Sequence, residues 1–386
     1  MVIDDLVNMN MIPHILHVID SLAPGGAERM AVEIANATDK QRYRVSVCVT
    51  RAKSSLALRP ALAANVPVHV LSRRFRFDLP AFWEFSALCR REQVHLLHVH
   101  NRPSFRFVAV LKALGCLPSV PVVFLDQYGD VEMNPRLPID LQWAVQFVKP
   151  YWVGVHPNLI SVAAGVDVNP EKTFVITNAI DFARFDCVPE TSLEDILGPA
   201  HSTPVGIIIA NMRPQKDYIS LLHALAQVKD LSWHLLAVGG FSDPAYYQKC
   251  LELMYALELE ERITFLGPRL DVPTLLKVVD FAVLSSRSES GPLVLLEYAA
   301  AGLPFVSTRV GLIGDSLARL GIPEFVPPQD VHELARALRR LLNLNPGERK
   351  ERGTKTRELA KPYFDIRNVM PKWYQLYERA LEESTL

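Results

Sequence analysis

Two cationic side chains, Arg213 and Lys216, follow a short apolar run near the middle of the chain, in the sequence IIIANMRPQKD. The run has the composition of a buried strand, and ligands of open α/β sheets bind just beyond the carboxyl ends of such strands. Because arginine offers a planar fork of donors and lysine a point charge, a diphosphate can use both. The alternative is a solvated helix start at which Asp217 pairs with Lys216.

Two carboxylates flank a predicted helix start further along, in the sequence SSRSESGPLVLLEYAAAGLPFVST. Glu289 precedes the helix and Gly291 and Pro292 open it; a proline at the first helical position leaves the following amides free to face an anion. An acidic residue near a helix start could simply complement the helix dipole. Glu297, however, lies among apolar residues on both sides, where a carboxylate is either paired or ready for a ligand. We therefore predict that Glu297 binds vicinal hydroxyls, such as those of a ribose.

Gly25 and Gly26 lie in the turn between the first predicted strand and the helix that follows it. Glycine lets a ligand approach the backbone closely, and a helix N-terminus offers unpaired N–H groups to an anion. The alternative is a strand-to-helix turn that requires glycine for its positive φ. The dinucleotide fingerprint G-x-G-x-x-G is absent, which excludes NAD as the first interpretation of this turn.

His98 and His100 end the predicted strand HLLHVH and are followed by Asn101. Because alternate residues of a strand point to opposite faces, the two imidazoles share one face. A metal site would need a third ligand, which the sequence does not identify, and no metal is predicted. We interpret His98, His100 and Asn101 as contacts to a sugar or acceptor; the alternative is a buried, hydrogen-bonded strand end.

Basic and aromatic residues gather between Arg73 and Lys112, where eight Lys and Arg stand against three acidic residues. The aromatic residues are interleaved with the basic ones, as in RRFRFDLPAFWEF and NRPSFRF. A basic, aromatic face is typical of peripheral contact with an anionic membrane surface or with an anionic acceptor. The alternative is a set of ordinary solvated helix faces.

Short apolar runs alternate with amphipathic stretches along nearly the whole chain, which predicts parallel α/β sheets with helices on both faces. The predicted strands of the first half are Pro13–Ile19, Arg44–Thr50, Pro67–Leu71, His95–Val99, Pro121–Leu125, Tyr151–Val155 and Thr173–Thr177. The alternation stops at 186–204, which holds three prolines, and then restarts. We therefore predict two doubly wound domains, 1–185 and 205–365, a linker over 186–204 and a separate amphipathic C-terminal helix within 366–386.

The composition excludes several classes of protein. Of the 386 residues, 49% are hydrophobic and 22% are charged, which excludes a disordered chain or a coiled-coil rod. A net charge of −1 gives no sign of a nucleic-acid-binding protein, and five scattered cysteines argue against disulfides or a zinc site. The start of the chain lacks a basic signal-peptide region, and no run reaches the ~18–20 apolar residues of a spanning helix. These features predict a soluble cytoplasmic protein.

Taken together, the motifs resemble those of a known family. GGAER after the first strand, HVHN, NAID at 178–181, the pair Arg213 and Lys216, and Glu-x7-Glu followed by AAAGLPFVST occur in this order. Over about residues 13–340 the chain resembles the retaining nucleotide-sugar glycosyltransferases of family 4. The resemblance implies the GT-B fold, in which two Rossmann-like domains face a central cleft and the C-terminal helix crosses back to the first domain.

The resemblance also implies roles for individual residues. Arg213 and Lys216 would hold the donor diphosphate and stabilise the leaving nucleotide, and Glu297 would bind the ribose. Glu289 would contact the transferred sugar and complete the catalytic group with the two cations. The other donor contacts would be Gly25, Gly26, Gly267, Arg269, Gly291, Leu293 and Val294. No metal or other cofactor is implied, and the donor would be a UDP-sugar or, as second choice, a GDP-sugar.

The implied acceptor is a glycan or a lipid-linked molecule used in the synthesis of cell-surface polysaccharide or glycoconjugate. The basic and aromatic segment from Arg73 to Lys112 would then place this cytoplasmic protein at the inner face of the membrane. Four departures from the family pattern concern the site. The usual E-G-F-G reads Glu289-Ser290-Gly291-Pro292, and the later G-G-x-x-E motif appears as Gly311-Leu312-Ile313-Gly314-Asp315. Asn211 stands where glycine is usual, and Asp126 or Gln127 stands near the place of a histidine that usually contacts the transferred sugar. Two other functions therefore remain open: a degenerate GT-B protein that binds glycan or nucleotide without turnover, and a nucleotide-sugar epimerase.

Overall fold

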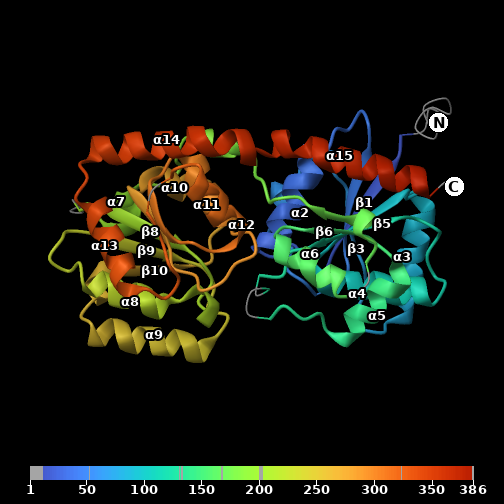
Figure 1. Cartoon of the computed structure of the whole chain (residues 1–386), viewed down its shortest axis with the longest axis horizontal. Helices are drawn as coiled ribbons and strands as arrows, with labels where there is room; N and C mark the ends of the chain where they lie inside the picture. Colours follow the sequence, from blue (N-terminus) through green and yellow to red (C-terminus); the bar gives the residue numbers. More distant parts are fainter. Residues whose placement is uncertain are drawn as a thin grey trace. The chain divides into compact units, whose positions relative to one another are not determined.

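Residues 12–51, 53–129, 131, 134–166, 168–199, 203–322 and 324–384 are described by the computed structural model (Figure 1). The prediction about a signal peptide concerns residues 1–11, which lie outside the described part of the chain. The chain forms two compact units. One is the chain up to Ala179 together with the chain from Ile366 onward, and the other is Ile180–Asp365.

The first unit contains a seven-stranded sheet whose paired strands all run parallel. Its spatial order is β3 (Val68–Val70), β2 (Arg44–Val49), β1 (His14–Ile19), β4 (Leu96–His100), β5 (Val122–Asp126), β6 (Tyr151–Gly154) and β7 (Thr173–Val175). Every residue of β1, β4 and β5 is buried, as expected for strands covered on both faces. The strand order reverses between β1 and β4, which is where such sheets bind ligands.

Helices cover the first sheet, and the last of them comes from the far end of the sequence. They are α2 (Gly26–Ala37), η1 (Arg59–Ala61), α3 (Leu79–Arg91), α4 (Asn101–Ala113), α5 (Ile139–Val148), α6 (Pro157–Ala164), η2 (Pro170–Lys172) and α15 (Ile366–Glu383). Residues Val369, Trp373, Leu376 and Tyr377 of α15 recur at helical spacing and are buried. This stripe packs α15 against α2 and β4 (Figure 1).

The second unit contains a six-stranded parallel sheet of the same kind. Its spatial order is β10 (Ile263–Gly267), β9 (His234–Val238), β8 (Val205–Ile209), β11 (Phe281–Leu284), β12 (Phe305–Thr308) and β13 (Phe325–Val326). The order reverses between β8 and β11, so the loops that follow these two strands start side by side. Both units thus have the doubly wound architecture that the alternating pattern predicted.

The helices of the second unit connect these strands. They are η3 (Phe182–Asp186), α7 (Leu193–Leu197), η4 (Pro214–Lys216), α8 (Tyr218–Ala226), α9 (Pro244–Ala256), η5 (Glu260–Arg262), α10 (Val272–Val278), α11 (Leu293–Ala301), α12 (Gly311–Arg319), α13 (Val331–Leu342) and α14 (Pro346–Phe364). Within the described residues, no helix of either unit is long and apolar enough to cross a membrane.

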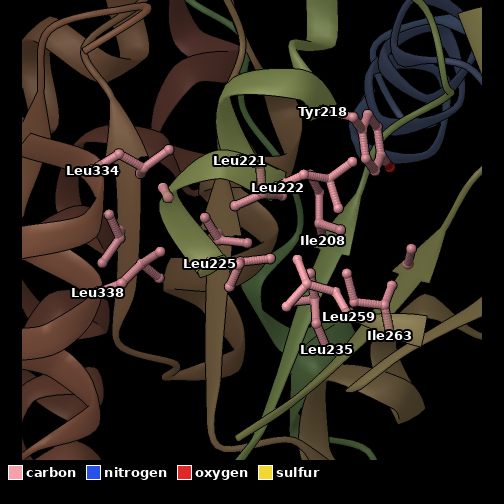
Figure 2. Close-up of a cluster of buried hydrophobic side chains, with 14 of the residues drawn as sticks. Ile208, Tyr218, Leu221, Leu222, Leu225, Leu235, Leu259, Ile263, Leu334 and Leu338 are labelled. Atoms are coloured by element: carbon pink, nitrogen blue, oxygen red, sulfur yellow. The ribbon is translucent and has the colours of Figure 1, made fainter. Parts of the chain in front are cut away.

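A buried apolar cluster holds α8 in place beside β8. Leu221 and Leu225 of α8 belong to the same cluster as Ile208 of β8 and Leu334 and Leu338 of α13 (Figure 2). Burying a side chain of this size stabilises a fold by about 1.5–3 kcal/mol relative to exposure. The short loop between β8 and α8, which carries the predicted cations, is therefore anchored at both ends.

The described residues of the predicted linker, 186–199 and 203–204, lie within the second unit rather than between the two units. At its start, Arg357 of α14 donates through Nη2 to Asp186 Oδ1 at 2.6 Å and through Nη1 to Ala300 O at 2.6 Å. Ser192 and Asp195 then form a capping box that starts α7. The three prolines mark a stretch outside the sheet, but local contacts still fix the beginning of this stretch to the second unit.

Candidate functional site

The carboxyl ends of β8 and β11 are joined by hydrogen bonds between the loops that follow them. Gln215 Nε2 donates to Ser288 O at 2.7 Å, and Ser285 Oγ donates to Lys216 O at 2.9 Å. The amide of Arg287 donates to Gln215 O at 2.8 Å. These bonds place the two sequence motifs predicted for an anion, the cation loop and the glutamate loop, in direct contact at the reversal point of the sheet.

Lys216 and Glu289 form an ion pair across these loops. Lys216 Nζ contacts Glu289 Oε1, and Ser286 Oγ donates to the same oxygen at 2.8 Å. The side chains of Lys216 and Glu289 are 14% and 9% exposed. The alternative pairing of Lys216 with Asp217 is wrong, because Asp217 accepts from Arg287 Nη2 at 2.9 Å and from Ser220 Oγ at 2.8 Å as it caps α8.

Arg213 starts the turn η4, and its side chain is exposed. Among the described residues it has no ion-pair partner. The turn therefore presents one cation that is already paired, Lys216, and one that is open to solvent, Arg213. A ligand with two negative charges could be bound by both.

The glutamate loop runs directly into α11. Pro292 is the residue before the helix rather than its first residue, and α11 begins at Leu293. The amides of Leu293 and Val294 thus belong to the first helical turn, which has no intrahelical acceptors. Glu297 is half-buried one turn further along the helix, and Gly291 is half-buried before it. Tyr298 holds α11 against the sheet, because its hydroxyl accepts from Ile209 N at 3.0 Å and donates to Val283 O at 3.2 Å.

Gly311 was not counted among the predicted contacts, yet it shapes the glutamate loop. Its φ is +65°, and a Cβ atom at this position would lie 2.9 Å from the carbonyl oxygens of Glu289 and Ser290. Leu312 N donates to Ser290 O at 3.2 Å. Only glycine allows α12 to begin this close to the Glu289 backbone.

Three further predicted positions lie on neighbouring loops of the second unit. Gly267 ends β10 with φ +67°, and Arg269 forms two hydrogen bonds with Asp271 at 2.8 and 2.5 Å. These bonds raise the pKa of Arg269. Asn211, the departure from the family glycine, accepts from Gly240 N at 2.7 Å and so links the ends of β8 and β9.

In the first unit, Gly25 precedes α2 and Gly26 begins it. The alternative of a positive φ is wrong for Gly25, whose φ is −132°. A Cβ atom at Gly25 would instead lie 2.3 Å from Glu28 Oε2. Ser21 Oγ donates to the same carboxylate at 3.1 Å, and burial raises the pKa of Glu28. A carboxylate therefore occupies the helix start that was predicted to receive an anion.

His98 and His100 are fully buried, which corrects their interpretation as acceptor contacts. His98 Nδ1 and the hydroxyl of Tyr377 in α15 are hydrogen-bonded at 2.8 Å, and the His98 ring lies 4.8 Å from that of Trp373. His100 Nε2 is hydrogen-bonded to His17 Nδ1 of β1 at 2.9 Å. The buried strand end, which was the alternative, describes both residues.

His17 completes a cluster with His98 and His100, and it was not predicted from the sequence. The sequence held a clue to this cluster, because the histidine-containing runs HILHVI and HLLHVH form neighbouring strands. One nitrogen from each of the three imidazoles could be offered to a metal, and these atoms lie within 4.8 Å of one another. The rings of His98 and His100, however, stack at 4.3 Å with 17° between their planes, so one ion cannot lie in both planes. Burial lowers the pKa of all three, that of His100 to about 3, so the cluster is neutral.

The remaining predicted sugar contacts are engaged within the first unit. Asp126 is buried and accepts from Arg102 Nη2 at 2.9 Å, so its expected role as a sugar contact is not supported. Gln127 is half-buried and donates to Asn178 at 3.1 Å. Asn101 donates to Asp20 at 2.6 Å and accepts from the amide of Ser104 at 3.0 Å, which starts α4.

Two family models match the chain. Residues 24–184 match a model described as Glycosyltransferase Family 4, and residues 203–344 match one described as Glycosyl transferases group 1. The two matches include both the GGAER motif and the paired cation and glutamate loops.

Two curated relatives are similar to the chain over about two thirds of its length or more. The chain is 28% identical over 259 residues to N-acetyl-alpha-D-glucosaminyl L-malate synthase of Bacillus anthracis, covering 66% of this chain and 64% of the relative. It is 25% identical over 308 residues to a component of the phosphatidylinositol N-acetylglucosaminyltransferase of Arabidopsis thaliana, covering 76% and 64%. The matched regions thus span less than two thirds of the length of these relatives.

Solved structures show the same fold. HepE of Anabaena in complex with UDP and glucose aligns with a TM-score of 0.78 at 21% identity, covering 95% of this chain and all of that one. Sucrose-phosphate synthase of Thermosynechococcus elongatus aligns with a TM-score of 0.75 at 19% identity, covering 96% and 100%. The architecture of two Rossmann-like sheets is that of GT-B proteins.

Proposed function

The chain belongs to the family 4 glycosyltransferases, and from this membership we propose that it transfers a sugar from a nucleotide-diphosphate donor to a glycan or lipid-linked acceptor in glycoconjugate synthesis. The observation that carries the proposal is the pairing of Lys216 with Glu289 where β8 and β11 end. The crystal structure of HepE is a complex with UDP and glucose. A relative from Escherichia coli, 28% identical over 151 residues, is a galactosyltransferase whose name gives UDP-Gal as the donor. A UDP-sugar is therefore the first donor to test and a GDP-sugar the second.

In the proposed donor complex, the diphosphate replaces Glu289 as the partner of Lys216. Arg213 supplies the second cation, and the amides of Leu293 and Val294 supply uncharged donors. Glu289, still oriented by Ser286, then accepts hydrogen bonds from hydroxyls of the transferred sugar. Glu297 binds the ribose, and the loop at Gly267 and Arg269 lies near the base.

The proposed transfer retains the anomeric configuration and needs no metal ion. The largest contribution to lowering the activation barrier is electrostatic, because the leaving diphosphate gains negative charge next to Arg213 and Lys216. The acceptor oxygen bonds to the anomeric carbon on the face from which the diphosphate leaves, and a departing phosphate oxygen takes the proton of the acceptor hydroxyl. No side chain therefore acts as nucleophile or base. Positioning of donor and acceptor supplies the remainder.

A donor-turnover assay tests the proposal. The protein is incubated with UDP- and GDP-sugars and candidate acceptors in the presence of a chelator, and the released nucleotide and the anomer of the product are measured. We expect Glu289→Gln to slow transfer by roughly tenfold or more, because a hydrogen bond to a charged group contributes about 1.5–3 kcal/mol and the neutral amide would hold the sugar hydroxyls less strongly. Glu258→Gln, which changes an exposed partner of Lys229 in the same unit, should leave the rate unchanged.

The same assay separates the alternatives. Free epimerised donor formed without any acceptor would favour an epimerase. Nucleotide binding without product, with every donor and acceptor tried, would favour the degenerate binder. An inverted product anomer or a complete loss of activity with chelator would contradict the retaining, metal-independent mechanism.

The protein is also proposed to contact an anionic membrane surface through its first unit. Ile139, Trp143 and Phe147 are spaced four residues apart on α5, and each is more than half exposed. Phe77 and Trp83, within the predicted basic and aromatic segment, are exposed as well. Apolar side chains beside many arginines match a bilayer that carries anionic lipid.

Co-sedimentation with phosphatidylglycerol vesicles tests this contact. Trp143→Ser should release the protein from the vesicles, whereas Tyr255→Ser, at an exposed aromatic residue of the second unit, should not. Equal sedimentation of Trp143→Ser and the unchanged protein would contradict the proposed contact.

A further inference from the structure

A cavity of about 920 Å³ opens in the first unit where β1, β2 and β3 end. Its lining includes six cations and two acidic residues, Asp20 and Asp140. The cations are Arg51, Lys53, Arg73, Arg74, Arg76 and Arg106. The lining therefore carries an excess of four positive charges, although the whole chain is nearly neutral.

Arg73 is the most informative of these residues, because it is only 8% exposed. Its Nε donates to Phe75 O at 3.2 Å, and its Nη1 donates to Thr50 Oγ1 at 3.2 Å. Its guanidinium carbon lies 4.7 Å from the ring centre of Phe107. All these partners are uncharged, and Arg73 forms no ion pair with a described residue.

A buried cation without an anion is unfavourable unless a ligand supplies the charge. Burial first, and the positive charge of Arg51 second, lower the pKa of Arg73, while the negative charges of Asp20 and Asp78, neither of which forms an ion pair with it, act in the opposite direction. The acidic residues of the lining do not neutralise its excess of positive charge. Arg76 and Arg106 share the single carboxylate of Asp140, at 3.1 and 2.7 Å. Arg51 lies 3.9 Å from Asp20, which also accepts from Asn101.

The size and charge of the cavity indicate the class of ligand. Ligand pockets of small molecules have volumes of about 300–1,000 Å³, so this cavity has room for more than an inorganic ion. A single carboxylate could be bound by one arginine, whereas an excess of four charges matches a phosphate or diphosphate ester. Apolar side chains also border the cavity, since Phe75 and Phe107 are part of its lining.

We propose that this cavity binds the phosphate or diphosphate group of the acceptor, with Arg73 as its central contact. The proposal rests on the proposed glycosyltransferase function, because it assigns the acceptor of that reaction to a chemical class. The phosphate can come from a water-soluble sugar phosphate or from a lipid-linked phosphate. Both present the same group to Arg73.

Calorimetric titration with glucose 1-phosphate tests the water-soluble source. Methyl glucoside, which lacks the phosphate, is the matched probe. We expect glucose 1-phosphate alone to bind, and Arg73→Met to weaken its binding at least tenfold. Arg91→Ala, which removes an exposed arginine of the same unit outside the cavity, should leave binding unchanged. A double variant, Arg51→Ala with Arg76→Ala, repeats the test at side chains that are 57% exposed, in case Arg73→Met does not fold.

Vesicles test the lipid source. Phosphatidylcholine vesicles with a minor fraction of phosphatidic acid present a phosphate monoester, and phosphatidylglycerol at equal charge does not. Preference for phosphatidic acid that is lost in Arg73→Met would assign the site to a lipid-linked phosphate. Binding of glucose 1-phosphate without this preference would assign it to a soluble one.

Measuring UDP binding in the same variants distinguishes a failure of the acceptor site from a failure of the donor site. Lys216→Ala should abolish stabilisation by UDP yet keep the binding of glucose 1-phosphate, and Arg73→Met should do the reverse. Normal UDP stabilisation with no binding of either phosphate probe, or binding that Arg73→Met and the double variant leave unchanged, would overturn the acceptor site alone. Absence of UDP stabilisation in the unchanged protein would instead contradict the donor site.

Discussion

Two ion pairs, one fully and one partly buried, show why residue type alone did not separate ligand contacts from structural ones. The carboxylate of Asp126 accepts hydrogen bonds from Nη2 of Arg102 at 2.9 Å and from the amide of Tyr128 at 3.2 Å, and it has no exposed surface. The carboxylate of Glu289 accepts hydrogen bonds from Lys216 and Ser286, but it lies in a loop at the reversal point of its sheet. The Arg102–Asp126 pair is therefore a structural contact inside the first unit. The Lys216–Glu289 pair lies where a bound anion can replace Glu289 as the partner of Lys216.

The histidine cluster predicts a loss of stability in acid. His17, His98 and His100 are neutral when folded because burial lowers their pKa, that of His100 to about 3. In the unfolded chain they take up protons below about pH 6.5. The neutral histidines therefore make their full contribution to stability above pH 6.5. Below it, the free energy of unfolding falls by about 1.4 kcal/mol per histidine per pH unit, until the pH reaches the pKa of each histidine in the folded protein.

Melting temperatures between pH 7 and 5 check this expectation. The melting temperature should fall steeply over this range, and His100→Gln should make the decline shallower. His332→Gln, at an exposed position in the second unit, should not change the slope. A slope that is the same in His100→Gln and in the unchanged protein would show that the cluster does not control the acid response.

At the scale of elements, short loops rather than helices carry the candidate chemistry. The turn η4, the glutamate loop and the start of α12 meet where β8 and β11 end, held by the bonds of Gln215, Ser285 and Leu312. The helices on either side, α8 and α11, are fixed by the apolar cluster and by Tyr298. Rigid elements thus position loops whose own side chains remain available to a ligand.

Gly311→Ala tests how closely α12 must approach the glutamate loop. The added Cβ would meet the carbonyl oxygens of Glu289 and Ser290 at 2.9 Å, in addition to the strain of a positive φ. Gly321→Ala is the matched control, since its φ is +79° and a Cβ there has no atom within 4 Å. We expect both variants to lose about 1 kcal/mol through φ, Gly311→Ala to lose more, and only Gly311→Ala to weaken UDP binding.

Denaturant unfolding and nucleotide titration of the two variants provide the measurement. Equal stability losses with unchanged UDP binding in both would mean that the loop tolerates a shift of α12. The approach of Gly311 would then have no part in shaping the donor site.

At the scale of the whole molecule, local patterns predicted the sheets well and the long-range packing poorly. The predicted strand Pro13–Ile19 matches β1 within one residue, because a buried parallel strand has a strong local signature. The predicted strand Thr173–Thr177 matches β7 within two residues, although β7 is a partly exposed edge strand. The cation and glutamate motifs were also found, since both follow strands directly.

The burial of His98 could not be predicted in the same way. Tyr377, which covers it, lies 279 residues further along the chain, and nothing in HLLHVH indicates that α15 packs there. The cavity around Arg73 was likewise visible in the sequence only as a basic segment. Its cations come from separate loops and helices, so only the folded first unit shows which of them share one space.

Thermal unfolding with UDP tests the central claim most directly. A donor site filled to 100 times its dissociation constant should add about 2.7 kcal/mol of stability. We expect UDP to raise the melting temperature of the unchanged protein and of Lys229→Ala, whose lysine pairs with Glu258 elsewhere in the second unit. Lys216→Ala should fold but gain no stability from UDP. A shift as large in Lys216→Ala as in the unchanged protein would contradict the assignment of the Lys216–Glu289 site to the donor diphosphate.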